Sequence, residues 1–239
     1  MKEKVVLITG ASSGIGSELL RLFSLSGYKV YSVARSGEKL AEIKNEIIQQ
    51  FPEANITNIE ADISLEKSLD TIYEIISKET HIDILINNAG LLINKPFEEF
   101  NREDWNKIYN TNTASVYFLT QRLLPLLKSD SSNPTHIINI SSMGGYQGSS
   151  KFPGLSAYSS SKAALANITE CLAEELKEYT IKVNCIALGA VRTEMLKKAF
   201  PDYMGGADPQ LIAEYIYDFA TKAHYLMNGK IIPLSNSTP

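Results

Sequence analysis

Tyr158 and Lys162 stand four residues apart in a run that favours a helix, so both side chains leave the same helix face. A phenol has a pKa of about 10, and a nearby ammonium favours its ionised form. Such a pair makes a proton donor and acceptor that works near neutral pH. A surface Lys stem lying over a half-buried ring gives the same spacing. The rest of the chain has to decide between the two interpretations.

A glycine-rich segment joins the first expected strand to the first expected helix. Its glycines permit a tight turn and close approach of the backbone to a pyrophosphate at the helix N-terminus. The spacing, Gly-x3-Gly-x-Gly, differs from the common Gly-x-Gly-x2-Gly, so the strand–turn–helix context carries the prediction of a dinucleotide site. The residues predicted to line this turn are Gly10, Ser12, Ser13, Gly14, Ile15 and Gly16.

The same segment supports a second, minor interpretation. Residues 10–14 also fit Gly-x-Ser-x-Gly, the nucleophile turn of serine hydrolases, with Ser12 as nucleophile. That chemistry needs a histidine later in the chain. Of His81, His136 and His224, only His224 comes late enough.

The residue after the second expected strand bears on the choice of nucleotide. An acidic residue there would bind the ribose hydroxyls of NAD, whereas an Arg can hold the 2′-phosphate of NADP. The chain has Arg35 at this point and no acid beside it. We therefore expect NADP(H) to be favoured over NAD(H), although a surface Arg beside a helix is nearly as common.

Composition excludes several classes of protein. The net charge of −4, without a basic tract, argues against nucleic-acid binding. Cys171 and Cys185 lack metal-ligand spacing, so we expect buried, inert thiols and no metal site. The N-terminus turns polar too early for a signal peptide, and no apolar run is long enough to span a membrane. A cytoplasmic protein is the expectation.

Short apolar runs alternate with helical patterns along all 239 residues. The expected strands are Val5–Thr9, Lys29–Ala34, Ile56–Ala61, Ile84–Asn87, His136–Ser141, Ile181–Ala187 and Lys230–Leu234. The expected helices are Ile15–Ser26, Glu38–Gln50, Leu65–Lys78, Asp104–Lys128, Ala157–Glu178 and Pro209–Tyr225. Continuous apolar strands are typical of parallel sheets buried on both faces. The pattern predicts one α/β domain over residues 1–239, a doubly wound parallel sheet of about seven strands with helices on both faces.

Taken in order, these motifs resemble the short-chain dehydrogenases/reductases over essentially the whole chain. The matching positions are Thr9 to Gly16, Asp62 after the third strand, Asn87 to Gly90 after the fourth, Asn112, Ser141-Ser142 after the fifth, Tyr158-x3-Lys162, and Gly189-x3-Thr193 after the sixth. The resemblance implies a nicotinamide cofactor and reversible oxidoreduction of a carbonyl and an alcohol.

The resemblance also implies a role for each motif residue. Tyr158 is the acid/base, Ser142 stabilises the substrate oxygen, Lys162 lowers the Tyr158 pKa and holds the nicotinamide ribose, and Asn112 holds a water of a proton relay. Ser141 replaces Ser142 if the register differs by one. The remaining implied contacts of the cofactor, besides the turn and Arg35, are Asp62, Asn88, Ala89, Gly90, Tyr158, Lys162, Gly189, Val191 and Thr193.

Two departures from the family pattern concern the substrate side. The stretch from Ser142 to Tyr158 is about three residues longer than usual, which we assign to a polar loop at residues 148–151. Leu188 stands where the family usually has Pro, so the turn at Gly189 loses a fixed φ.

The substrate and the partners stay open at this stage. The expected walls of the substrate site, residues 91–97, 143–157 and 190–207, offer apolar and aromatic side chains. These side chains suit an apolar ketone or a 3-oxoacyl chain, and a small carbohydrate also fits. The family resemblance implies a homodimer or homotetramer formed through the two long helices. A non-catalytic, dinucleotide-binding redox sensor is the alternative from another class, and the presence of Tyr158 argues against it.

Overall fold

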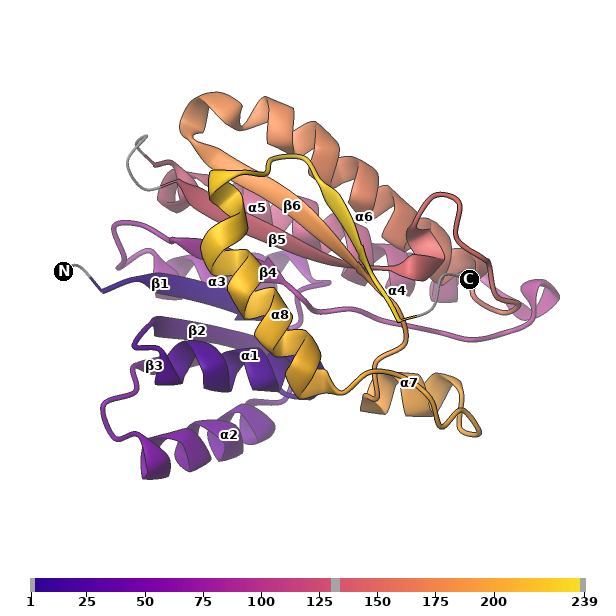
Figure 1. Ribbon diagram of the computed structural model, residues 1–239, viewed down its shortest axis with the longest axis horizontal. Coiled ribbons are helices and arrows are strands. Elements are labelled where there is room, and N and C mark those ends of the chain that lie inside the picture. The colour runs from indigo at the N-terminus through magenta and orange to yellow at the C-terminus, as the bar shows by residue number, and fades with distance from the viewer. Residues whose placement is uncertain (1–2, 130–133, 237–239) are drawn as a thin grey trace.

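The computed structural model describes residues 3–129 and 134–236. Seven parallel strands form one sheet in the order β3-β2-β1-β4-β5-β6-β7 (Figure 1). The strands are β1 (Val5–Thr9), β2 (Lys29–Ala34), β3 (Ile56–Glu60), β4 (Ile84–Asn87), β5 (Thr135–Ser142), β6 (Ile181–Leu188) and β7 (Ile231–Leu234). The predicted doubly wound parallel sheet of about seven strands is confirmed.

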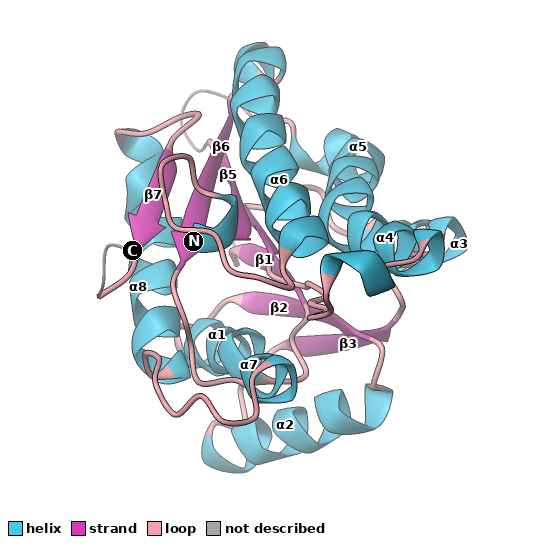
Figure 2. Ribbon diagram, turned by 90° about the vertical axis from the view of Figure 1, so that its right-hand side faces the viewer, coloured by secondary structure: helices cyan, strands magenta, loops and turns pink. Residues whose placement is uncertain are grey.

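Helices cover both faces of this sheet (Figure 2). They are α1 (Gly14–Leu25), α2 (Gly37–Gln50), α3 (Glu66–Ile76), α4 (Arg102–Tyr109), α5 (Ser115–Leu127), α6 (Ser156–Glu175), α7 (Glu194–Ala199) and α8 (Pro209–Lys222). One core joins α1, α2 and α8 to the sheet, and the other joins α3, α5 and α6 to the opposite face. Because alternate residues of each strand enter opposite cores, apolar side chains of the central strands lie on both faces of the sheet.

The strand order places one crevice above the centre of the sheet. β1 pairs with β2 on one side and with β4 on the other, so the chain winds away from β1 in both directions. Ligands of open α/β sheets bind outside the carboxyl ends of the strands at such a switch point. The segments that follow β1, β4, β5 and β6 all meet there.

The structure differs from the sequence-based expectation in three places. The expected helix over residues 104–128 is divided, because a π turn at Asn110–Ala114 separates α4 from α5. The short helix α7 lies in a segment that was expected to be loop. Cys171 is exposed on α6 and only Cys185 is buried, so the expectation for Cys171 was wrong. Its apolar neighbours face the core, and Cys171 itself lies on the outer side of the helix.

His136, near the amino-terminal end of β5, connects the sheet to α8 by hydrogen bonds. Its Nδ1 lies 2.9 Å from the Ala220 carbonyl and its Nε2 lies 3.0 Å from the Asn184 amide nitrogen. A neutral ring that donates from Nδ1 and accepts at Nε2 satisfies both partners. Burial lowers the pKa of His136 to about 3, so the ring is neutral in the folded protein.

This neutral ring predicts an acid-dependent loss of stability. The pKa of His136 is lower in the folded chain than the ordinary 6.5, so its contribution is complete above pH 6.5 and is lost as the pH falls toward 3. Between pH 7 and 4.5 the free energy of unfolding should fall by about 2 kcal/mol more in the native protein than in His136→Asn, which keeps a donor near Nδ1. Urea unfolding at the two pH values measures this difference. Equal losses in the two proteins would contradict the assignment.

Candidate active site

The turn after β1 has a geometry that only glycine permits. Gly10 and Gly14 have φ values of +69° and +56°, in the left-handed region. A Cβ on Gly16 would lie 2.1 Å from the Gly10 carbonyl oxygen, and one on Gly10 would lie 2.8 Å from the Cα of Ala89. The turn is therefore folded tightly on itself and pressed against the segment after β4.

The first turn of α1 keeps its amide groups available. Ser13 precedes the helix in an extended conformation, and its side chain does not cap it. An uncapped helix N-terminus that follows a glycine turn presents N–H groups and a partial positive charge to an anion. Ser12 lies on the same turn and is partly exposed. These features fit the pyrophosphate of a dinucleotide.

Thr9 fastens the ends of β1 and β4 together. Its hydroxyl accepts hydrogen bonds of 3.1 Å from the backbone N–H groups of both Asn88 and Ala89. The Asn88 side chain donates back to the carbonyls of Thr9 and Gly10, at 3.0 and 3.2 Å. The two predicted segments of the site thus form one rigid unit. The sequence shows Thr9 only as part of the motif, because the residues that it bonds to lie far away along the chain.

At the adenosine end, the structure adds an acid that the sequence did not indicate. Arg35 is exposed directly after β2, and Asp62 is held by Ser64, whose backbone N–H and hydroxyl donate to it at 3.0 and 2.7 Å. Glu60 ends β3 with its carboxylate beside Gly37, since a Cβ there would lie 2.4 Å from Glu60 Oε2. Glu60 pairs with Ala34 across β2 and β3, so this carboxylate lies at the end of the strand that Arg35 follows.

The two hydroxyls expected to work together act on each other. The Ser142 hydroxyl lowers the pKa of the Tyr158 phenol, as a donor toward the phenol oxygen does, and its oxygen accepts from the Gly144 N–H at 3.2 Å. Ser141, the alternative, is buried on the other side of β5 and donates to the Lys162 carbonyl at 2.8 Å. The register of β5 thus favours Ser142.

The extra residues before Tyr158 fold back on their own segment. Ser149 donates to the Tyr146 carbonyl at 2.9 Å and also bonds to Met143, and the Lys151 ammonium donates to Tyr146 at 2.7 Å. Because the inserted residues bond to residues 143 and 146 of their own segment, Ser142 keeps its place at the end of β5.

Lys162 is 4% exposed, and its ammonium donates to the Ile140 carbonyl at 2.8 Å. Burial lowers its pKa to about 8, against a smaller opposing effect of Cys185. The Lys162 Nζ also lies near Gly90, since a Cβ on that glycine would be 3.5 Å from it and 3.5 Å from Asn112 Oδ1. Gly90, Asn112 and Lys162 therefore meet under the site.

The pKa of Tyr158 moves opposite to the sequence-based expectation. Burial raises it, and the bond to Ser142 opposes that rise. Lys162, whose ammonium is bonded to the Ile140 carbonyl, is not among the causes of this shift. The phenol is therefore protonated at neutral pH, as a proton donor must be.

Asn112 is fully buried on the π turn. Its amide donates to the Leu91 carbonyl and to the Ser161 hydroxyl, both at 2.9 Å, and its oxygen accepts from the Leu91 N–H at 2.7 Å. The side chain thus holds the segment after Gly90 against α6. A π turn is frequent at functional sites, because it interrupts the regular helix ladder.

The segment after β6 closes the other side of the site. Gly189 donates its N–H to the Leu234 carbonyl at 2.9 Å, and Ser235 leaves no space for a Cβ there. Val191 is buried, and Thr193 caps α7 through Leu196 at 3.3 Å. A Cβ on Gly14 would lie 3.0 Å from Thr193 Cγ2, so this segment touches the glycine turn.

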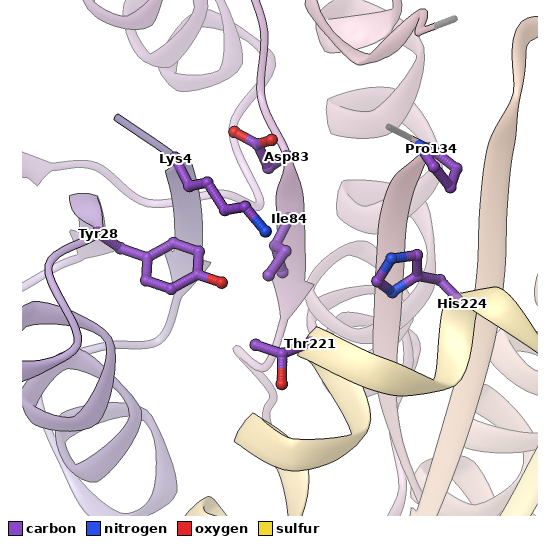
Figure 3. Close-up of a pocket in the computed structure, with 7 residues that line it drawn as sticks. All are labelled: Lys4, Tyr28, Asp83, Ile84, Pro134, Thr221 and His224. Carbon is purple, nitrogen blue, oxygen red and sulfur yellow. The ribbon is translucent and has the colours of Figure 1, made fainter. Parts of the chain in front are cut away.

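The histidines lie at the amino-terminal ends of the strands, opposite the candidate site. His224 lines a small pocket with Lys4, Tyr28 and Asp83, which precede or begin strands (Figure 3). His81 and His136 also lie at the amino-terminal ends of the strands, where Thr135, the first residue of β5, lies 3.3 Å from His81 Nε2. No histidine is therefore near Ser12, and the serine hydrolase interpretation fails. Within residues 3–129 and 134–236, no cluster of His, Cys, Asp or Glu forms a metal site, and no helix is long and apolar enough to span a membrane.

Comparison with known proteins identifies the family of this chain. The family model described as short chain dehydrogenase matches residues 4–204. An uncharacterized oxidoreductase of Staphylococcus aureus is 29% identical over 231 residues, which cover 95% of this chain and 96% of that protein. One from Staphylococcus epidermidis is 33% identical over 196 residues, which cover 82% and 81% of the two chains.

Two solved structures share the whole fold. The 3-ketoacyl-(acyl-carrier-protein) reductase of Brucella melitensis, complexed with NADH, is 28% identical with a TM-score of 0.85, and 96% of each chain is covered. RhlG of Pseudomonas aeruginosa, in a complex with NADP, is 28% identical with a TM-score of 0.88, and 98% and 96% are covered.

The glycine turn makes a prediction that separates dinucleotide affinity from stability. Gly16→Ala pushes a Cβ into the Gly10 carbonyl, so the turn must open and NADPH affinity should fall at least tenfold. Gly27→Ala is the control, since Gly27 has a φ of +76° with no atom within 4 Å of its Cβ position. Strain there costs about 1 kcal/mol of stability without touching the site. NADPH fluorescence titration and thermal unfolding measure both quantities, and equal affinities for the two variants would contradict the assignment.

Proposed function

Because the chain belongs to the short chain dehydrogenase family, whose members are NAD(P)-dependent oxidoreductases, we propose that it interconverts a carbonyl and an alcohol with NADP(H). The observation that carries the proposal is the Tyr158–Ser142 pair beside the buried Lys162. The proposed substrate is a ketone, an aldehyde or a 3-oxoacyl compound. In support, a structural relative is a 3-ketoacyl reductase by name.

The cofactor residues act by position. The α1 N-terminus and its glycine turn bind the pyrophosphate, Asp62 binds the adenine, and the segments at Asn88–Gly90 and Gly189–Thr193 enclose the nicotinamide half. Lys162 holds the nicotinamide ribose. The cofactor supplies the hydride, and the protein supplies binding, orientation and protons.

Proton transfer is assigned to the polar residues under the substrate oxygen. Tyr158 donates its phenolic proton to that oxygen in the reductive direction, and Ser142 donates a hydrogen bond where negative charge develops. A water held at Asn112 returns a proton from solvent to the phenolate left behind. The raised pKa of Tyr158 suits this order, since the phenol starts protonated.

Removal of the Tyr158 hydroxyl tests the proposed acid. Tyr158→Phe should lower kcat for ketone reduction at least a thousandfold and leave the NADPH Kd within threefold of the native value, because the ring still packs. Tyr225→Phe, which lies beside His224 at the amino-terminal ends of the strands, is the control and should keep kcat. NADPH absorbance and fluorescence titration give the two readouts. Retained turnover by Tyr158→Phe would exclude this residue as the acid.

The preference for NADP(H) follows from Arg35 and is opposed by Glu60. Arg35→Ala should narrow the ratio of NADH to NADPH dissociation constants about tenfold, since one phosphate contact is lost. Glu60→Gln should widen it, because a carboxylate near the 2′-phosphate is removed. Titration of each protein with both cofactors measures the ratios. Equal affinities in the native chain would refute the preference.

Three further points remain predictions. The redox-sensor alternative needs the glycine turn without Tyr158, and the oxidoreductase family speaks against it. A homodimer or homotetramer through the long helices is supported by the exposed Tyr117 and Phe118 on α5. Cytoplasmic location is expected from the sequence alone.

A further inference from the structure

Three segments form a rim around the carboxyl ends of β4, β5 and β6: residues 91–100, 146–155 and 192–207. Figure 1 shows them together on its right-hand side, and Figure 2 shows that side facing the viewer. The large apolar side chains that they expose are Phe97 (81% exposed), Phe152 (52%), Met195 (38%), Tyr203 (52%) and Met204 (87%). Contiguous exposed apolar patches mark binding sites, and these side chains lie on the segments that follow β4, β5 and β6.

Several charges of the rim are already bonded within the protein. Lys95 pairs with Asp104 at 2.5 Å, and Arg192 pairs with Asp208 at 2.8 Å. The Lys151 ammonium is held by Tyr146. These groups fasten the rim, and the apolar side chains remain for the substrate.

The third segment has little packing of its own. α7 buries none of its side chains. The base of the segment is closed, since the Ala207 N–H donates to the Ala190 carbonyl at 2.9 Å and the Arg192–Asp208 pair spans it. The start of α7 is held by Thr193 against the glycine turn and by the Lys39–Glu194 ion pair, so contacts near Ala199 fix its other end.

Asn94 joins the three segments at one point. Its amide donates to the Ala199 carbonyl at the end of α7, at 2.9 Å. The next residue, Lys95, donates its N–H to the Gly154 carbonyl at 3.2 Å. A Cβ on Gly154 would lie 2.0 Å from Asn94 Oδ1, so glycine at this position lets the Asn94 side chain occupy its place.

We propose that Asn94 is a positioning residue that holds the three rim segments together, so that their exposed apolar side chains bind the apolar body of a carbonyl substrate. This proposal rests on the carbonyl reduction proposed above. It commits the substrate to an apolar compound rather than to a small carbohydrate. Asn94 acts through Ala199 and Gly154 and takes no part in the transfer of hydride or proton.

The test compares reduction of 2-decanone, an apolar ketone, with reduction of dihydroxyacetone, a small polar one. The native protein should have the lower KM for 2-decanone. Asn94→Ala should raise that KM about fivefold, which corresponds to one hydrogen bond of about 1 kcal/mol. Asn94→Asp, which keeps the shape and loses the donor to Ala199, should act in the same direction. The NADPH Kd of both variants should stay within twofold of the native value, whereas a folding defect would weaken NADPH binding as well.

Two glycines with positive φ give a matched pair. Gly154→Ala and Gly27→Ala carry a similar backbone strain, with φ values of +79° and +76°, but only the first directs a Cβ at Asn94. Gly154→Ala should raise the KM for 2-decanone as Asn94→Ala does, and the variant with both Asn94→Ala and Gly154→Ala should resemble either single one. Gly27→Ala, which lies outside the rim, should keep the native KM.

Each result decides one statement. An unchanged KM in Asn94→Ala, equal effects of the two glycine variants, or a native preference for dihydroxyacetone would overturn the inference while carbonyl reduction stands. If the native protein reduces no carbonyl although it binds NADPH, the proposed function falls and the inference falls with it.

Discussion

The buried ammonium of Lys162 is the constraint on which the site depends. Its pKa of about 8 lies below the ordinary value, so burying this ammonium lowers the free energy of unfolding at pH 7 by on the order of 3 kcal/mol, although the group stays mostly protonated. A single strand carbonyl, that of Ile140, accepts from it. Lys is almost never fully buried without such a partner. A chain that keeps this charge under a polar site has a use for it in binding or in catalysis.

The surrounding elements position this group and its neighbours. The end of β5 supplies the Ile140 carbonyl and then Ser142, while the first turns of α6 supply Tyr158 and Lys162. The π turn turns Asn112 toward Leu91 and Ser161, so the segment after β4 is held against the same helix. Thr9 joins that segment to the glycine turn. The phosphate end and the proton-transfer end of the site therefore share one frame.

The sequence predicted the fold well, because its signals are local. Continuous apolar runs identified the strands within one or two residues, and the glycine turn marked the start of α1. The break at Asn110–Ala114 was not predictable, since the π turn follows from the tertiary bonds of Asn112. The carboxylate of Glu60 beside Gly37 and the bond from Asn94 to Ala199 join residues far apart in sequence. The direction of the Tyr158 pKa was also missed, because spacing on a helix says nothing of burial or of where the ammonium points.

The central claim is hydride transfer to a carbonyl with a proton from Tyr158, and isotopic labelling tests it most directly. Reduction of 2-decanone by NADPH that carries deuterium at the transferred position of the nicotinamide should give an alcohol with one deuterium on the carbinol carbon. Mass spectrometry of the product reads this out, and a parallel reaction in D2O with unlabelled NADPH should leave that carbon free of deuterium. An alcohol that takes its carbon-bound hydrogen from solvent, or NADPH that binds without forming any alcohol, would contradict the account.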